Sequence, residues 1–142
     1  MTDPDEIAAA VARFMSERDQ FARALGIELL DLRPGYSRVG MTIAPYMVNG
    51  LGIAHGGVIF SLGDFAFAAA GNSHGQTAVA LSMDIHFLRT PDPGTYLTAE
   101  AIEVRKGRRT ALYRITISDA QGNLIADLHG MAYRKEEGFL RA

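Results

Sequence analysis

The sequence contains no cysteine, which excludes disulfide bonds, thiolate metal sites and a cysteine nucleophile. It also lacks a strong charge imbalance, because 14 basic and 16 acidic residues leave a formal net charge of -2. Such a balance gives no electrostatic reason to bind nucleic acid or an acidic membrane. We therefore expect neither nucleic acid nor a membrane among the partners of this chain.

Signals for export, membrane insertion and metal binding are missing as well. Residues 1–6 are acidic and have no basic or long apolar stretch, so they do not resemble a secretory signal. The longest apolar stretch, residues 58–70, contains polar interruptions and is too short to span a bilayer. The four histidines form no HxH or HExxH pair, so we expect no metal site and no other cofactor. A cytoplasmic location is the natural expectation.

The length of 142 residues suits one domain, spanning 1–142, and the 48% of hydrophobic residues suffice for a core. Apolar residues at near-helical spacing predict a helix in the N-terminal segment, from about residue 4 to 24, and another at 58–70. The strand-like runs, separated by turn residues, are 27–32, 37–44, 77–88, 95–105, 109–118 and 124–134. Because strands follow one another directly, we expect an α+β fold with a largely antiparallel sheet and the long helix on one face.

The helix at 58–70 has apolar residues on two sides, so both sides should be buried. The side that we take as the core face consists of Val58, Leu62, Phe65 and Ala69. The other side, which we call the outer stripe, consists of Gly57, Phe60, Ser61, Asp64, Phe67 and Ala68. One sheet cannot cover both sides of a helix in a domain of this size. We therefore expect a second subunit to cover the outer stripe.

Asp64 is then a carboxylate in an apolar setting, where an unpaired charge is costly. Carboxylates that are perturbed in this way within clefts are candidates for a functional role. The structural alternative is that Asp64 caps a neighbouring segment or pairs with an arginine.

The residues His55-Gly56-Gly57 precede this helix and form a second candidate site. Glycines expose backbone N–H groups, and the first N–H groups of a helix lack internal partners at its positive end. Such a site can polarise a carbonyl, although two glycines could also simply allow a tight turn. Gly56 and Asp64 lie about 12 Å apart along the axis, at ~1.5 Å per residue. They either serve different tasks or meet across a two-fold interface between antiparallel helices.

The spacing of Asn49, His55-Gly56-Gly57 and Asp64 resembles the motif of hotdog-fold thioesterases, in particular the phenylacetate-pathway branch. That branch hydrolyses phenylacetyl-CoA and similar thioesters. The resemblance extends over nearly the whole chain. It implies a strongly curved antiparallel sheet wrapped around the central helix, dimers that join sheets edge to edge, and a homotetramer built as a dimer of dimers.

The resemblance also implies roles for individual residues. Asp64 would be the general base or the nucleophile, and the amide of Gly56 would polarise the thioester carbonyl. Asn49 would hydrogen-bond near the acyl group or orient the loop, and His55 would support the site. Ser82 would help to hold the attacking water.

Substrate contacts are expected at the outer stripe and at basic residues. The phosphates of CoA should meet cations, and the densest basic run lies at a predicted turn at 105–109, with a further arginine at another strand end. A solvated hairpin tip is the alternative for this run. Phe60 and Phe67 are core residues by default, and the alternative is that one of them lines an acyl pocket, because both share the stripe of Asp64. The candidate substrate-binding residues are Gly57, Phe60, Arg89, Lys106, Arg108 and Arg109.

Thioester hydrolysis requires a carboxylate and a polarised carbonyl but no metal or redox cofactor. We therefore interpret the chain as an acyl-CoA thioesterase for phenylacetyl, hydroxylated phenylacetyl or medium-chain acyl groups. One alternative is a hotdog enoyl-CoA hydratase or dehydratase, which needs a histidine paired with a carboxylate. The other is a non-catalytic acyl-CoA-binding module, which has no need to bury an acid.

Overall fold

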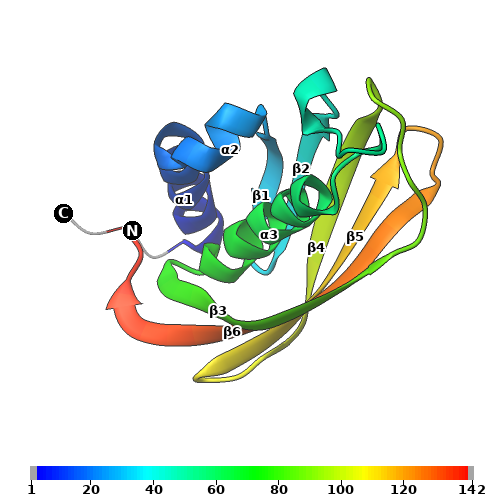
Figure 1. The fold of residues 1–142 in the computed structure, drawn as a ribbon. Helices are drawn as coiled ribbons and strands as arrows, with labels where there is room; N and C mark the ends of the chain where they lie inside the picture. Colours follow the sequence, from blue (N-terminus) through cyan, green and yellow to red (C-terminus); the bar gives the residue numbers. More distant parts are fainter. Residues whose placement is uncertain (1–2, 141–142) are drawn as a thin grey trace.

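The computed structural model describes residues 3–140 and contains one six-stranded sheet with its helices on one side (Figure 1). The helices are α1 (Pro4–Arg18), α2 (Gln20–Leu25), a short 3-10 helix η1 (Pro45–Met47) and α3 (Gly56–Asn72). The strands are β1 (Glu28–Arg33), β2 (Tyr36–Thr42), β3 (Gln76–Phe87), β4 (Tyr96–Lys106), β5 (Thr110–Asp119) and β6 (Leu124–Gly138). No helix within residues 3–140 is long and apolar enough to cross a bilayer.

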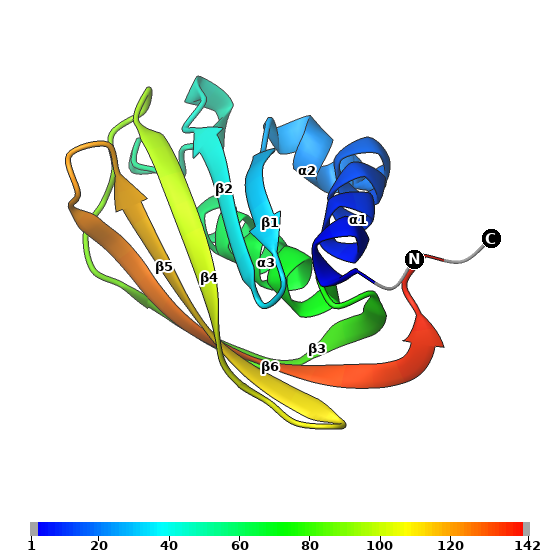
Figure 2. The same ribbon diagram turned by 180° about the vertical axis from the view of Figure 1, so that it is seen from behind.

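The strands lie in the order β1-β2-β4-β5-β6-β3, and all neighbouring pairs are antiparallel. The sheet curls around α3, and α1 and α2 lie beside β1, as the two opposite views agree (Figures 1 and 2). Bulges in the β3–β6 and β4–β5 pairings accompany this curvature. The arrangement confirms the predicted α+β hotdog fold. It leaves β3, the last strand in the order, with one unpaired edge.

The predicted helix at 4–24 is in fact two helices, because Asp19 interrupts it. The backbone of Asp19 is extended (φ -81°, ψ 98°), and its carboxylate accepts a hydrogen bond from the N–H of Ala22 at 3.0 Å. Asp19 therefore ends α1 and caps the N-terminus of α2. Apolar spacing cannot reveal this break, since an aspartate side chain competes locally with helical hydrogen bonds whatever the surrounding pattern.

The remaining boundaries differ from the predictions mainly where the chain is not apolar. Helix α3 begins at Gly56 rather than residue 58, because glycines carry no periodic signal. Strand β6 continues four residues beyond the predicted end, to Gly138, which pairs with Gln76 at the start of β3. The added residues are largely charged, so hydrophobic alternation misses them.

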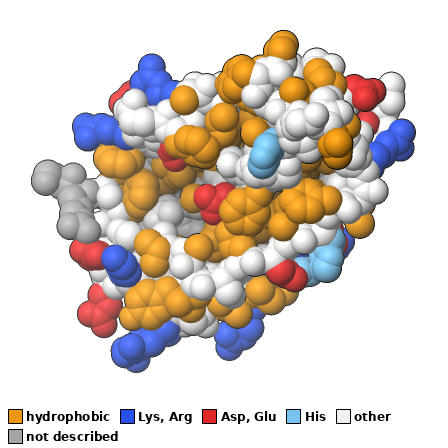
Figure 3. Space-filling model, viewed as in Figure 1, with side chains coloured by type: hydrophobic (Ala, Val, Ile, Leu, Met, Phe, Trp, Pro, Cys, Tyr) orange, Lys and Arg blue, Asp and Glu red, His pale blue; other side chains and the backbone are white. Residues whose placement is uncertain are grey.

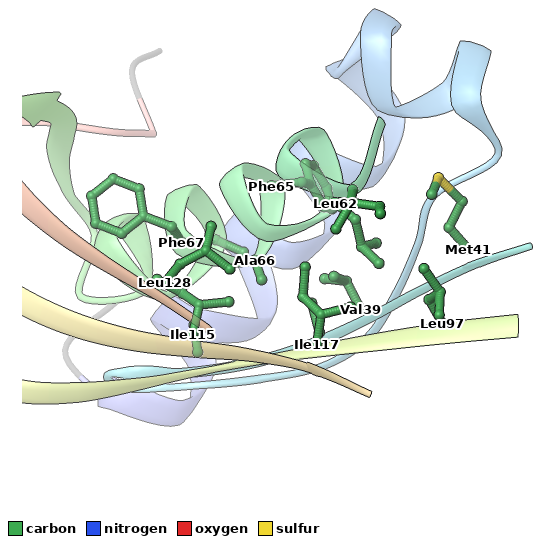
Figure 4. Packing of buried hydrophobic residues seen from close by; sticks show 14 of the residues in the cluster. Val39, Met41, Leu62, Phe65, Ala66, Phe67, Leu97, Ile115, Ile117 and Leu128 are labelled. Carbon is green, nitrogen blue, oxygen red and sulfur yellow. The ribbon is translucent and has the colours of Figure 1, made fainter. Parts of the chain in front are cut away.

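Helix α3 packs closely onto the concave face of the sheet. Leu62 and Ala66 are fully buried there, together with Ile115 and Ile117 of β5 and other apolar residues of the strands (Figure 4). A Cβ atom on Gly63 would lie 2.8 Å from Leu128 Cδ2, so a larger residue would have to displace the Leu128 side chain or move the helix away from the sheet. This close approach fixes the position of the helix turn that carries the next residue, Asp64.

The position of Phe67 corrects the prediction for the outer stripe. Its ring is buried and lies edge-on to the ring of Tyr113, with 5.7 Å between the ring centroids, in space left by Gly130. The curled sheet covers a wider arc of α3 than a flat sheet would, and Phe67 lies at the margin of that arc. The outer stripe is thus reduced to five residues that are exposed or half-buried: Gly57, Phe60, Ser61, Asp64 and Ala68.

Hydrogen bonds fix the C-terminal end of α3 to the sheet. The Ser73 hydroxyl accepts a hydrogen bond from the Gly35 N–H at 2.8 Å. Glu103 Oε1 lies 2.8 Å from His74 Nε2 and accepts a hydrogen bond from the Tyr113 hydroxyl, also at 2.8 Å. These contacts hold α3 at the end opposite to the His55-Gly56-Gly57 motif.

Candidate active site

The N-terminus of α3 presents an unpaired backbone donor. His55 is the N-cap residue, and its Nδ1 accepts a hydrogen bond from the N–H of Gly57 at 3.1 Å. The carbonyl of His55 accepts the N–H of Val58 at 3.1 Å. The N–H of Gly56 has no acceptor among residues 3–140, and it lies at the positive end of the helix dipole. This amide can donate to a carbonyl oxygen of a ligand.

Gly56 and Gly57 provide space rather than an unusual backbone conformation, because neither has a positive φ. A Cβ atom on Gly56 would lie 3.2 Å from the ring of Phe87, at the end of β3. A Cβ atom on Gly57 would lie 3.2 Å from His55 Nδ1, the atom that caps the helix. The two glycines are therefore not needed for a left-handed backbone conformation. Their lack of side chains accommodates Phe87 and the capping His55 at the N-terminus of α3.

Asn49 stabilises the loop that leads into α3. Its Oδ1 accepts hydrogen bonds from the N–H groups of Leu51, at 2.9 Å, and Ile53, at 3.3 Å. The backbone of Asn49 is also paired with Ile53, whose carbonyl accepts the Asn49 N–H at 2.8 Å. Of the two roles predicted for Asn49, this arrangement matches the one in which it orients the loop.

Asp64 lies on the outer stripe, half-buried, and neither a hydrogen bond nor an ion pair joins it to any residue between 3 and 140. It lines a small cavity of about 50 Å³ that α3 forms with α2 and the residues around it. Burial raises the pKa of its carboxyl group, and the negative charge of Asp19 raises it further. No arginine partner or capping role for Asp64 exists within the described chain.

The other predicted site residues do not gather around Asp64 within one chain. Gly56 lies eight residues earlier on the same helix, about 12 Å along its axis at ~1.5 Å per residue. Ser82 is exposed on β3, opposite Met131 of β6, and does not line the cavity that holds Asp64. Phe60 is half-buried and packs against the core. Within a single chain, the predicted site residues therefore do not converge on one place.

The basic candidates also lie at two separate places. Arg89 lines a pocket of about 370 Å³ together with Asp92 and Asp119, where the chain leaves β3 and β5 turns into β6. Arg108 and Arg109 line a different pocket, of about 130 Å³, near the start of β3 and the end of β6. Lys106 ends β4 beside this second pocket and is exposed. The four residues thus do not form one cationic surface.

Apolar side chains reach the surface both on the free edge strand and on the outer stripe. Figure 3 shows hydrophobic side chains gathered over α3 and β3, with an acidic side chain among them. On β3 the exposed apolar residues include Val79, at 44%, Leu81, at 58%, and Phe87, at 53%. An unpaired, apolar edge strand is a template for pairing with another chain.

Sequence reasoning did not identify Asp19 or Phe21, which line the cavity of Asp64 from α2. The available signal was the aspartate that interrupts a predicted helix, because this residue type favours N-cap positions. Within residues 3–140, no three His, Asp or Glu side chains converge in a way that could hold a metal ion.

Comparison with known proteins identifies the family. Residues 51–126 match the Thioesterase superfamily, and this span includes the His55-Gly56-Gly57 motif, Asp64 and Ser82. The chain is 42% identical over 123 residues to the acyl-coenzyme A thioesterase PaaI of Escherichia coli, covering 87% of this chain and 88% of that protein.

Solved structures agree with this assignment. The structure of the E. coli PaaI protein from the phenylacetic acid degradation operon matches with a TM-score of 0.93 and 38% identity, over 96% of this chain and 99% of that one. A hypothetical thioesterase protein from Streptococcus pneumoniae TIGR4, solved with coenzyme A, matches with a TM-score of 0.74 and 25% identity, over 77% of this chain and 88% of that one. From its fold, its motif at the start of α3 and these matches, the chain belongs to the thioesterase superfamily, as a hotdog-fold homologue of PaaI.

Proposed function

We propose that the protein hydrolyses acyl-CoA thioesters to the free acid and CoA, with phenylacetyl or hydroxylated phenylacetyl as the preferred acyl group and medium-chain acyl groups as the alternative. The observation that carries this proposal is the half-buried Asp64, which has no partner in the chain and lies on a helix whose N-terminus presents the free amide of Gly56. The acyl-coenzyme A thioesterase PaaI of E. coli and the coenzyme A in the S. pneumoniae structure support the substrate class.

The chemistry follows from these two groups. The N–H of Gly56 donates a hydrogen bond to the thioester oxygen and stabilises the negative charge that develops there. The carboxylate of Asp64 either attacks the carbonyl carbon, forming an anhydride that water then hydrolyses, or takes a proton from the attacking water. The CoA thiolate leaves in both routes and needs no strong acid. Both routes require Asp64 in its ionised form.

The separation of Gly56 and Asp64 leads us to propose a site shared between two chains. Antiparallel pairing of two β3 edges would join two sheets and bury exposed apolar residues such as Leu81. Such an isologous interface produces two equivalent sites. In each of them, Gly56 of one chain would work with Asp64 of its partner. Ser82, on the paired strands, would lie near the attacking water, and a dimer of dimers remains the predicted assembly.

The contacts that we expect with the CoA phosphates are compatible with the same interface. Phe87, beside Gly56, is the last residue of β3, and Gln76, beside Arg108 and Arg109, is the first. The twelve residues of the strand place these ends about 36 Å apart along its length, at roughly 3.3 Å per residue. Antiparallel pairing would bring the basic end of one chain next to the Gly56 end of the other. We therefore propose that Arg108 and Arg109 serve the partner's site.

Other proposed contacts are local. Lys106 would supplement the charge of Arg108 and Arg109, while Gly57 and Phe60 on the outer stripe would border the acyl group. Arg89 shares its pocket with two carboxylates, which already attract its charge. We therefore do not assign Arg89 a role in phosphate binding.

The geometry at His55 favours hydrolysis over the hydratase or dehydratase alternative. That chemistry needs a histidine paired with a carboxylate, whereas His55 Nδ1 accepts the N–H of Gly57 and no acidic residue between 3 and 140 pairs with its ring. Its position as helix N-cap is a supporting one.

A substrate panel tests the proposed function. We expect the protein to release free thiol from phenylacetyl-CoA and hydroxylated phenylacetyl-CoA with a higher kcat/KM than from benzoyl-CoA or straight-chain acyl-CoA. Release would be followed with a thiol reagent, and hydration of crotonyl-CoA would be followed in parallel. Binding of these esters without thiol release would indicate a binding module. Hydration without hydrolysis would indicate a hydratase, and either result would contradict the proposal.

A further inference from the structure

The cavity of Asp64 contains a second carboxylate that the mechanism above does not use. Its walls come from α2, the residues on either side of α2, and α3, and only Asp19 and Asp64 among the lining residues are titratable. The other lining residues are apolar or carry a hydroxyl group: Phe21, Ala22, Ile27, Ser61, Phe65 and Ala68. The Ser61 hydroxyl donates to the carbonyl of Gly57 at 2.8 Å, which leaves it unavailable as a donor to either acid.

The local fold holds Asp19 in place. One carboxylate oxygen caps α2 through its 3.0 Å hydrogen bond from the Ala22 N–H, and the N–H of Asp19 is bound to the carbonyl of Met15 at 3.0 Å. Ala22 itself is buried in the core beneath α2. A rotation of the Asp19 side chain would therefore break the hydrogen bond that caps α2. Its charge has a fixed position at the wall of the cavity.

No cation in the described chain neutralises this pair of acids. Arg23 and Glu28 line a neighbouring cavity of about 190 Å³, which Asp19 and Ala22 also line, but they do not line the cavity of Asp64. The guanidinium of Arg23 is bound to the carbonyl of Glu17 at 3.1 Å, and neither carboxylate forms an ion pair with it. The strands beneath α3 present apolar residues toward the helix. The charged residues around Glu103 lie at the C-terminal end of α3, away from Asp64. Asp19 is thus the charged group that faces Asp64.

We propose that Asp19 is a positioning residue for the hydrolysis: a fixed negative charge on α2 whose field acts on the Asp64 carboxylate across their shared cavity. The inference rests on the proposed catalytic role of Asp64. Two like charges in a partly dry cavity repel one another, so each makes the ionised form of the other less favourable. A carboxylate held in this way binds a proton more tightly and is a stronger base once ionised. Asp19 would therefore increase the reactivity of Asp64 at the expense of activity at low pH.

Asp19→Asn separates this electrostatic effect from the structural role of Asp19. Asparagine caps helices about as well as aspartate, so α2 should form normally without the charge. We expect the acidic limb of the kcat/KM profile to move to lower pH, and kcat on the plateau to fall by about two- to fivefold, far less than the loss of a general base would cause. Asp19→Ser, which also caps a helix without a charge, is a second variant. It allows the same test if Asp19→Asn does not fold.

Asp3→Asn is the matched control. Asp3 caps α1 by accepting a hydrogen bond from the N–H of Asp5 at 3.2 Å, and it lies outside the cavity. The same chemical change at the same type of position should leave the pH profile and the plateau unaltered. A shift in both variants would indicate a general effect of net charge and would overturn the proposal.

A carboxyl ¹³C NMR titration of Asp64, assigned from the signal missing in Asp64→Asn, gives a readout independent of turnover. We expect its midpoint to move to lower pH in Asp19→Asn and to stay unchanged in Asp3→Asn. An unshifted midpoint in Asp19→Asn would overturn the inference, even if activity fell equally at all pH values. Failure of the wild-type protein to release any thiol would instead overturn the proposed function on which the inference rests.

Discussion

Asp64→Asn is expected to lower kcat for thioester hydrolysis by about 10²- to 10⁴-fold, the range associated with loss of a positioned general base. The amide has nearly the same shape as the carboxylate but can neither attack the carbonyl nor accept a proton from water. The measurement is steady-state thiol release from phenylacetyl-CoA, with wild type and variant at equal concentration. Turnover that is unchanged in the variant would contradict the mechanism while leaving the family assignment intact.

The same variant should not lose stability, which distinguishes a catalytic acid from a structural one. Burial and the charge of Asp19 raise the pKa of Asp64 in the folded state. A raised folded-state pKa gives stability that is present below the unfolded pKa, of about 3.9, and is lost as the pH rises through the folded value. Above the folded value this loss is complete, so a neutral amide should there leave the free energy of unfolding equal or higher.

Asp127→Asn provides the contrast for this stability measurement. Asp127 is half-buried on β6 and accepts hydrogen bonds from the guanidinium of Arg114, at 3.2 Å. Its replacement removes the ion pair with Arg114, so the free energy of unfolding should stay the same or fall, while thiol release is retained. If urea denaturation showed a lower free energy of unfolding for Asp64→Asn than for wild type, Asp64 would be serving as a structural partner.

Leu81→Lys is expected to break the pairing of β3 edges, which lowers the mass of the oligomer, and to reduce thiol release by at least about 100-fold. Leu81 is 58% exposed on the free edge strand, and a lysine there is a common means of preventing edge-to-edge pairing. Activity should fall together with the mass, because separated chains would keep Gly56 and Asp64 about 12 Å apart, at ~1.5 Å per residue. Sedimentation velocity and the thiol assay on the same samples measure both quantities.

The control for the edge variant is Ile102→Lys. Ile102 is 51% exposed, similar to Leu81, but lies on β4 in the interior of the sheet order. Ile102→Lys should leave the pairing of β3 edges and the activity intact.

A fully active single chain of Leu81→Lys would show that one protomer contains a complete site. Persistence of the oligomer would show that another surface forms it.

The sequence predicts this fold well because its strands alternate and its turns contain strong turn residues. Leu112 and Tyr113, for example, face opposite sides of β5, as the period-two pattern requires. The motif at His55-Gly56-Gly57 also coincides with the N-terminus of α3. These features depend on local chemistry, which neighbouring residues in the sequence reveal.

The errors concern features that depend on tertiary structure. Phe67 has the spacing of the outer stripe, but the curled sheet and the space at Gly130 bury it. The sequence also does not show that Arg89 and Arg108 line different pockets, at opposite ends of β3. Asp19 and Asp64, which are 45 positions apart in the sequence, line the same cavity. No periodicity in the sequence encodes this proximity.

Gly56→Pro offers a way to remove one backbone donor without disturbing α3. Proline is tolerated at the first position of a helix, where it deletes an N–H that has no helical partner. The residue before it must be extended, and His55 already is, with φ -68° and ψ 132°. Gly56→Ala adds the same contact with Phe87 but keeps the N–H, and is therefore the matched control.

Co-expression of Gly56→Pro and Asp64→Asn chains carrying different affinity tags tests most directly whether the site is shared between protomers. Each variant alone should be nearly inactive. Random pairing makes about half of the two-fold pairs mixed, and each mixed pair restores one of its two sites, so the mixture should recover about a quarter of wild-type thiol release. Activity that stays at the level of the separate variants would contradict a site built from the helix start of one chain and the carboxylate of another.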